Sequence, residues 1–140
     1  MPARVLGLVL ALLLLAAAPA GAGEGDDREA ELDMLHAALL EADGMGEAQA
    51  IEARIWRIWL TAPDAAAQEM IDEAVARRGL GDLEGARAVL DRLIAERPGY
   101  AEGWNQRATI LFLEGKDEAS LADVAEVLER RPRHFGALAG

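Results

Sequence analysis

Few residues in this chain have the types and spacing that metal binding or catalysis requires. The two histidines, His36 and His134, stand far apart, and there is no cysteine, which excludes disulfide and thiol chemistry. A metal site needs three or four converging ligands, and Glu41, five residues after His36, does not share a helical face with it. His36 does share a face with Leu32 and Leu40, which favours a packing role. We therefore expect no metal and no cofactor.

Nucleophilic and phosphate chemistry have equally little support. Ser120 is the only serine, and it stands in a helical segment at a position that suits close packing of a small side chain. The glycines Gly79, Gly81 and Gly85 are not followed by the Lys-Ser/Thr pair of a phosphate loop. Acidic pairs such as Asp26-Asp27 are expected on solvated faces. The prediction is a protein that is not an enzyme; a small exported hydrolase or metal protein is the weakest alternative.

The charge balance restricts the classes of partner. The formal net charge is -11, with 25 acidic residues against 14 basic ones. Nucleic acids and anionic membrane surfaces both require clustered Lys and Arg, so neither is an expected partner. A basic or apolar protein or peptide fits this balance better. The use of a single Lys beside thirteen Arg, with abundant Ala and Gly, is typical of GC-rich bacterial coding.

The N-terminal segment has the pattern of a signal peptide. Arg4 is its first charged residue, and the apolar run 5–18 follows, shorter than the ~20 residues that a spanning helix needs. The small residues Ala20-Gly21-Ala22 come next and suit a cleavage site. We expect residues 1–22 to be a signal peptide, removal of Arg4 to leave a mature net charge of -12, and a periplasmic or secreted protein without a membrane span after cleavage. An uncleaved membrane anchor is the alternative.

The rest of the chain is organised around two copies of a 34-residue unit. Residue pairs 34 apart share their class, notably Gly81 with Gly115 and Pro98 with Pro132; further pairs are Ala74 with Ala108, Leu90 with Val124 and Leu93 with Val127. The pairing of Leu83 with Asp117 is the one polar mismatch. A fixed period of this length indicates a helical solenoid, in which each unit buries its apolar face against its neighbour.

This pattern resembles the tetratricopeptide repeat (TPR), whose signature runs Trp-x2-Leu-Gly-x2-Tyr, Ala-x3-Phe and Pro over 34 residues. In order of the Trp, small-residue, Tyr, Ala, Phe and Pro positions, the second copy carries Trp104, Ala108, Leu111, Ser120, Val124 and Pro132, and the first carries Met70, Ala74, Arg77, Ala86, Leu90 and Pro98. The resemblance implies an all-α, TPR-like solenoid of helical hairpins with a right-handed superhelix.

Two positions depart from the family pattern. Arg77 stands where an aromatic is usual, and the Leu position holds Glu73 in the first copy and Arg107 in the second. Because stacked repeats place equivalent positions side by side, we expect Glu73 and Arg107 to face each other. The alternative is that both side chains extend outward into solvent.

Periodicity and helix-breaking residues divide the chain into segments. We expect an acidic linker at 23–28, a degenerate helix hairpin at 29–62 that caps the N-terminal end of the array, and two repeats within 63–133 (67–100 and 101–134). Residues 134–140 read as the start of a further, truncated repeat. Asp64 and Asp82 are placed to cap helices. Leu121, Val124 and Leu128 would then form an uncovered C-terminal face.

In TPR arrays the first helices of successive repeats line a concave groove that receives an extended peptide or a partner helix. The resemblance implies that the groove residues here are Gln68, Ile71, Arg78, Asn105, Gln106, Thr109 and Phe112, with Asp72 and Val75 beside them. Asn105 and Gln106 could hydrogen-bond a peptide backbone, and Phe112 could supply an apolar anchor. The alternative is that Phe112 and Val75 complete the core between repeats.

Together these patterns predict a non-catalytic protein-interaction scaffold with a peptide or helix as ligand. The alternative function is a structural role in the cell envelope, in which copies of the chain assemble through the uncovered C-terminal face. The Lys/Asn pattern of repeats that clamp a C-terminal carboxylate is missing, so that class of ligand is not expected.

Overall fold

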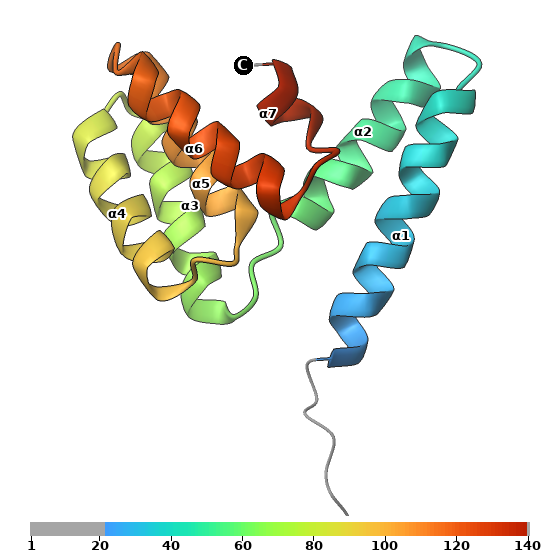
Figure 1. Ribbon diagram of the computed structural model, residues 1–140, viewed down its shortest axis with the longest axis horizontal. Helices are drawn as coiled ribbons and strands as arrows, with labels where there is room; N and C mark the ends of the chain where they lie inside the picture. The colour runs from blue at the N-terminus through green and yellow to red at the C-terminus, as the bar shows by residue number, and fades with distance from the viewer. Residues whose placement is uncertain (1–21, 140) are drawn as a thin grey trace, which may run out of the picture.

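The computed structural model describes residues 22–139, which form an all-α, helical-repeat fold, as the sequence predicts (Figure 1). The helices in this part of the chain are α1 (Ala22–Glu41), α2 (Met45–Trp59), α3 (Ala65–Gly79), α4 (Leu83–Glu96), α5 (Ala101–Leu113), α6 (Asp117–Arg130) and α7 (Phe135–Ala139). The predicted signal peptide, apart from Ala22, lies outside the described residues. Between residues 22 and 139, none of the helices combines the length and apolar character that crossing a bilayer would require.

The helices α3 to α6 form two consecutive hairpins with matching bounds. α4 and α6 begin at Leu83 and Asp117, which are 34 residues apart. The turns before them contain Gly81 and Gly115, whose φ angles of 81° and 73° lie in the left-handed region that glycine adopts without a steric penalty. The Asp82 carboxylate accepts a hydrogen bond from the N–H of Gly85 and caps α4. The same glycine conformation therefore closes both hairpins, whereas Lys116, at the start of α6, provides no side-chain cap.

The first hairpin and α5 share the larger apolar core. Ile71 and Ala74 of α3, Leu90 and Leu93 of α4, and Ile110 of α5 are at most 2% exposed and belong to one cluster. α5 thus packs against both helices of the preceding hairpin, which is the stacking that the repeat predicts. A smaller cluster joins α5, α6 and α7 through Ala101, Val127 and Ala137.

The structure corrects the prediction of an acidic linker. Residues 23–28 belong to α1, which begins at Ala22. Asp27 falls in its first turns, where the helix dipole favours negative charge, so the acidic composition that suggested a solvated linker also suits a helix start.

The α1–α2 hairpin was expected to cap the N-terminal end of the array, but it lies beside the C-terminal end. Its core, formed by Leu32, Leu35, Ile55 and Trp59, packs against Phe135 of α7, and Figure 1 shows α7 between α6 and α2. Ion pairs join Arg131 to Glu29 (2.8 Å) and Arg133 to Asp33. These side-chain contacts, and not the order of the chain, determine where the hairpin lies, because the partners of its aromatic side chains are at residues 131–136.

Candidate partner-binding site

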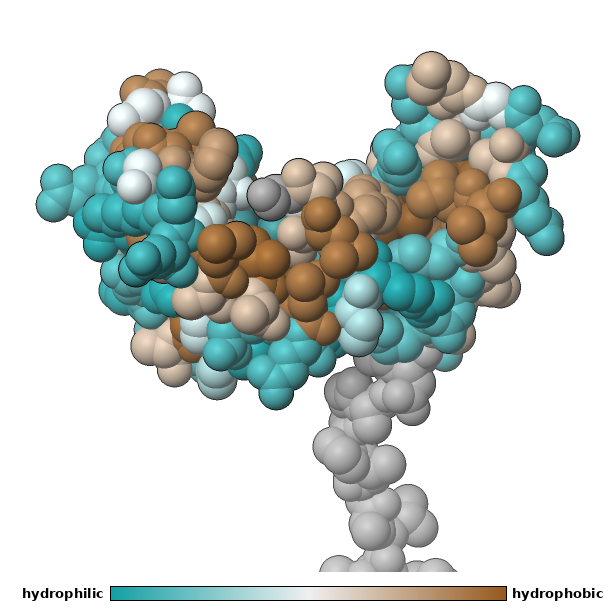
Figure 2. Space-filling view, turned by 45° about the horizontal axis from the view of Figure 1, so that its top comes forward, coloured by the Kyte–Doolittle hydropathy of each residue, from teal (hydrophilic) through white to brown (hydrophobic). Residues whose placement is uncertain are grey.

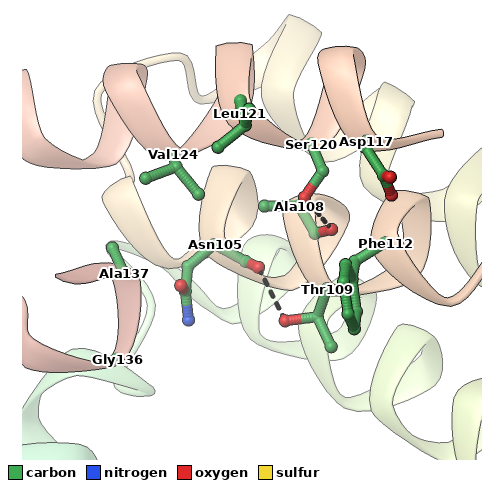
Figure 3. Close-up of a pocket in the computed structure, with 10 residues that line it drawn as sticks. All are labelled: Asn105, Ala108, Thr109, Phe112, Asp117, Ser120, Leu121, Val124, Gly136 and Ala137. Atoms are coloured by element: carbon green, nitrogen blue, oxygen red, sulfur yellow. Dashed lines mark hydrogen bonds between the residues drawn. The ribbon is translucent and has the colours of Figure 1, made fainter. Parts of the chain in front are cut away.

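An open hollow lies between α5, α6 and α7. Its volume is about 310 Å³. Figure 3 shows the residues that line it, which come from α5, α6 and α7: Asn105, Ala108, Thr109, Phe112, Asp117, Ser120, Leu121, Val124, Gly136 and Ala137. Figure 2 shows apolar surface gathered in the middle of the molecule, where it is hollowed between the repeats and the α1–α2 hairpin.

The walls of this hollow are mainly apolar and unusually exposed. Phe112 is 65% exposed and Leu121 is 62% exposed. The small polar side chains are satisfied within the protein: the Thr109 hydroxyl donates to the Asn105 carbonyl (3.1 Å), and the Ser120 hydroxyl donates to the Ala108 carbonyl (2.8 Å). The hollow therefore offers a ligand apolar contact more than free hydrogen-bonding groups.

A buried polar network lies behind the hollow, centred on the carboxylate of Glu102, which is 1% exposed. Its Oε1 accepts hydrogen bonds from Asn105 Nδ2 (3.0 Å) and Gln106 Nε2 (2.6 Å), and its Oε2 lies 3.1 Å from His134 Nε2. Arg78 Nη1 in turn donates to Gln106 Oε1 (2.9 Å). Every carboxylate oxygen thus has a donor, as burial of an acidic group requires.

The bonds to His134 identify its tautomer. The imidazole is fully buried, and its Nδ1 accepts from the N–H of Ala137 (3.2 Å) in the first turn of α7. A nitrogen that accepts carries no proton, so the proton resides on Nε2 and is donated to Glu102. His134 therefore orients α7 and satisfies Glu102 at the same time.

Aromatic rings fasten the α1–α2 hairpin to this network. Trp59 stacks on His134 with centroids 3.8 Å apart and planes 13° from parallel. Trp56 meets His134 and Phe135 edge-on, with centroids 5.5 Å and 5.7 Å away. The hydroxyl of Tyr100, immediately before α5, donates to the Trp59 carbonyl (3.1 Å), and its burial raises the pKa of Tyr100 well above the ordinary value. The hairpin thus holds the end of the array that forms the hollow.

A second polar cluster lies on the other face of α5. Arg107 binds Asp123 of α6 with two parallel hydrogen bonds (2.7 and 2.8 Å) and reaches Asp91 of α4 (2.9 Å). These hydrogen bonds raise the pKa of Arg107 above its ordinary value, and the bond to Asp123 has the largest effect. The expected pairing of Glu73 with Arg107 is wrong, because Glu73 instead binds Arg77 one helical turn away (2.8 Å).

Comparison with known proteins finds a similar stretch in a curated relative. A stretch of 51 residues is 53% identical to a TPR repeat-containing protein of Rhizobium etli. The stretch is 36% of this chain and 25% of that protein, so the match spans about a quarter of the relative's length. No family model matches the chain, and no solved structure matches it.

The match agrees with the hairpins at 34-residue spacing. The chain has a TPR-like helical-repeat fold. The residues expected to line a TPR groove can now be placed in the structure.

The groove residues named from the TPR resemblance separate into three groups. Asn105, Thr109 and Phe112 lie together at the hollow. Gln106 and Arg78 bind each other beside it, with Gln106 only 8% exposed.

The two remaining groove candidates lie elsewhere on α3. Gln68 is engaged at the start of that helix, where its side chain accepts from the Ala62 N–H (2.9 Å) and donates to Asp72 (3.0 Å). Ile71 is 1% exposed inside the core, so the structure places it beneath the surface of the TPR groove.

Sequence reasoning missed the buried network of Glu102, His134 and Trp59. A partial signal exists in the spacing of Glu102, Asn105 and Gln106, because positions i, i+3 and i+4 meet on one helix face. The contact with His134 has no local signal, since 32 residues separate it from Glu102.

Residues 22–139 hold no group of three or more His, Cys, Asp or Glu that could bind a metal ion. His36 donates from Nδ1 to the Leu32 carbonyl (2.7 Å) on its own helix.

Proposed function

We propose that this TPR-type protein is a non-catalytic scaffold that binds a peptide or helix of a protein partner in the hollow between α5, α6 and α7. The observation that carries the proposal is the exposure of Phe112 and Leu121 on facing sides of an open, mainly apolar cavity. Large apolar side chains gathered at one exposed site are typical of interaction surfaces. Thr109 and Asn105 complete the wall of the cavity.

The net charge supports a partner that is basic or apolar. At -11 the chain repels other acidic proteins and attracts basic ones at long range. Assembly of copies through the same exposed face is the second candidate, favoured by Leu121 and by Leu138, both 62% exposed.

We also propose that the protein is exported to the periplasm or secreted, with residues 1–22 as a cleaved signal peptide. The support is the apolar run after Arg4 and the small residues at 20–22. Fractionation of cells expressing the full chain, with N-terminal sequencing of the recovered protein, tests it; recovery in the cytoplasm with Met1 or Pro2 at the N-terminus would contradict it.

The binding proposal is tested by selecting peptides on the wild-type chain from a random phage-displayed library. Their affinities are then measured for wild type, for a Phe112→Ser/Leu121→Ser variant and for a Leu80→Ser control. Leu80 is 87% exposed at the turn after α3, away from the hollow. Leu80→Ser is therefore the same type of substitution made outside the proposed site. We expect the double variant to lose at least about tenfold in affinity, or 1.4 kcal/mol. Equal binding by all three proteins would contradict the proposal.

A further inference from the structure

A cavity with a different character lies at the base of the α1–α2 hairpin, where α1 begins and α2 ends. Its volume is about 320 Å³. The residues that line it come from α1, from α2 and from the segment directly after α2: Arg28, Glu31, Arg54, Arg57, Ile58 and Thr61. None of these six residues lines the hollow between α5, α6 and α7, so the two cavities are separate sites.

The fold brings three guanidinium groups to this cavity. Arg54 and Arg57 are three residues apart near the end of α2, so they lie on one face of that helix. Arg28 lies near the start of α1, which packs against α2 as the other helix of the hairpin. The sequence does not reveal the cluster, because Arg28 is 26 residues from Arg54 and 29 from Arg57.

The charge of the lining is opposite in sign to that of the whole chain. Three arginines and one glutamate line the cavity, although the net charge of the chain is -11. Arg54 Nη2 donates to Glu31 Oε1 (2.9 Å), so this carboxylate offsets one guanidinium. The Arg57 guanidinium has no ion-pair partner between residues 22 and 139. Because like charges in one cavity repel, an anion bound there would relieve an unfavourable interaction.

A purely structural role accounts for only one of these arginines. Arg57 lies in the last turn of α2, where a cation complements the helix dipole. That role requires neither Arg28 on the other helix nor Arg54 one turn earlier. The convergence of all three on one cavity therefore indicates a ligand that accepts hydrogen bonds from several guanidinium groups.

An adjoining cavity provides space for an uncharged part of such a ligand. It has a volume of about 440 Å³ and shares three of its lining residues with the first cavity. Its two further arginines, Arg97 and Arg131, bind the carboxylates of Asp64 and Glu29. Their charge is thus offset within the protein, and the excess positive charge lies in the first cavity.

We propose that the cavity lined by Arg28, Arg54 and Arg57 binds a phosphate or sulfate group, either as the free ion or as part of a small organic molecule. A guanidinium presents parallel N–H groups that match two oxygens of such an anion. Arginines from two helices approach from different directions, which suits a tetrahedral group with oxygens on several sides better than a planar carboxylate.

The distribution of charge favours a small anion over an extended one. At physiological salt, charges more than about 8 Å apart are largely screened, so a small ion responds mainly to the arginines around it. A nucleic acid or an anionic membrane would also face the rest of the surface, whose net charge repels it. The site is therefore compatible with an acidic protein and is independent of the partner proposed for the hollow.

The test is a titration of the ¹⁵N-labelled wild-type chain, followed by NMR, with inorganic phosphate and with phenyl phosphate. Sodium chloride is adjusted to keep the ionic strength constant, and the arginine Nε–Hε signals report the binding. The same titrations are made with Arg57→Gln, with Arg57→Lys and with the control Arg92→Gln. Arg92 is an exposed arginine of α4 outside both cavities and, like Arg57, forms no ion pair within the described part of the chain.

We expect the signals of Arg28, Arg54 and Arg57 to shift together and to saturate with one dissociation constant, while that of Arg92 does not shift. Arg57→Gln should weaken binding at least about tenfold, because the amide lacks the charge. Arg57→Lys keeps the charge without the paired N–H groups, so its affinity should be intermediate. Arg92→Gln should bind as the wild type does.

The two ligands distinguish the sources of the anion. Tighter binding of phenyl phosphate would assign the site to an organic phosphate whose remaining part lies in the adjoining cavity, and equal binding would assign it to the free ion. Shifts that rise without saturation, or that are as large at Arg92, would overturn the proposal by showing only ionic screening. Unchanged affinity in Arg57→Gln would also overturn it.

Discussion

His134 has two separable roles at the scale of single residues, a ring stacked on Trp59 and a hydrogen-bond donor to Glu102. The substitution His134→Phe keeps an aromatic ring but leaves Glu102 Oε2 without a donor. Because an unpaired buried acceptor costs about 1–3 kcal/mol, and more for a charged group, we expect the free energy of unfolding to fall by at least that amount. Urea unfolding followed by circular dichroism measures it.

The matched control for this prediction is His36→Phe. His36 is half-buried, and within residues 22–139 it hydrogen-bonds only to a carbonyl of its own helix, so its replacement should cost less than that of His134. Equal costs for the two variants would mean that the bond to Glu102 contributes nothing specific.

The helix caps Asp64 and Asp82 determine how the protein responds to acid. Arg97 and the Ala67 N–H lower the pKa of Asp64 below its ordinary value of 3.8, and the Gly85 N–H and Arg77 lower that of Asp82. A carboxyl whose pKa is lower in the folded state stabilises the fold above its unfolded pKa, and this contribution is lost as pH falls through the folded value. We expect Asp64→Ala/Asp82→Ala to unfold at lower temperature than wild type at neutral pH, with the difference shrinking below pH 3.8.

Thermal unfolding from about pH 6 to about pH 2 measures this difference. Glu69→Ala is the control, because Glu69 is an exposed carboxylate on α3 that forms no ion pair within residues 22–139. A difference between wild type and the double variant that stays constant down to the lowest pH would contradict the assignment of the caps.

At the scale of elements, the end of α3 and the turn after it contain two glycines with different conformational requirements. Gly81 has φ 81° and Gly79 ends α3 at an ordinary helical angle, and an added Cβ would meet nothing within 4 Å at either. Gly81→Ala should therefore destabilise the protein by about 1–2 kcal/mol through backbone conformation alone. Gly79→Ala should be neutral or stabilise by up to about 1 kcal/mol, since alanine favours helix. Thermal unfolding of both variants compares them directly, and equal effects would refute the conformational explanation.

The elements themselves were largely predictable, because each depends on local sequence. Period-3.6 apolar patterns, the capping aspartates and the repeated glycine turns specify the two hairpins within a few residues. The position of the α1–α2 hairpin was not predictable. It depends on the contact between Trp59 and His134, which are 75 residues apart in the chain, and no periodic sequence pattern predicts such a contact.

The candidate site was predictable only in part, for the same reason. Asn105, Thr109 and Phe112 follow from the positions of a TPR groove, and the structure brings them to the hollow. Leu121 and Val124 were recognised as an uncovered face, but their junction with Phe112 into one cavity depends on how α6 and α7 pack on α5. Arg107 does not pair with Glu73, because Asp123 on the adjacent helix accepts two hydrogen bonds from the Arg107 guanidinium.

At the scale of the whole molecule, the α1–α2 hairpin and the repeats are held together by a contact that leaves no space for an added side-chain atom. A Cβ added to Gly136 of α7 would lie 2.6 Å from Trp56 Cη2 and 3.2 Å from His134 Cε1. Gly136→Ala must therefore displace the Trp56 ring or α7, and a large aromatic in a packed site has little freedom to move. We expect the hairpin to loosen from the repeats while the repeats stay folded.

Hydrogen exchange resolves that outcome by element. In Gly136→Ala, amides of α1, α2 and α7 should exchange faster than in wild type, while those of α3 and α4 keep their rates, because the larger core does not include the hairpin. Gly99→Ala is the control, since a Cβ there meets nothing within 4 Å. Faster exchange spread evenly over all helices would show that hairpin and array unfold as one unit, and unchanged exchange would show that the contact at Gly136 does not hold them together.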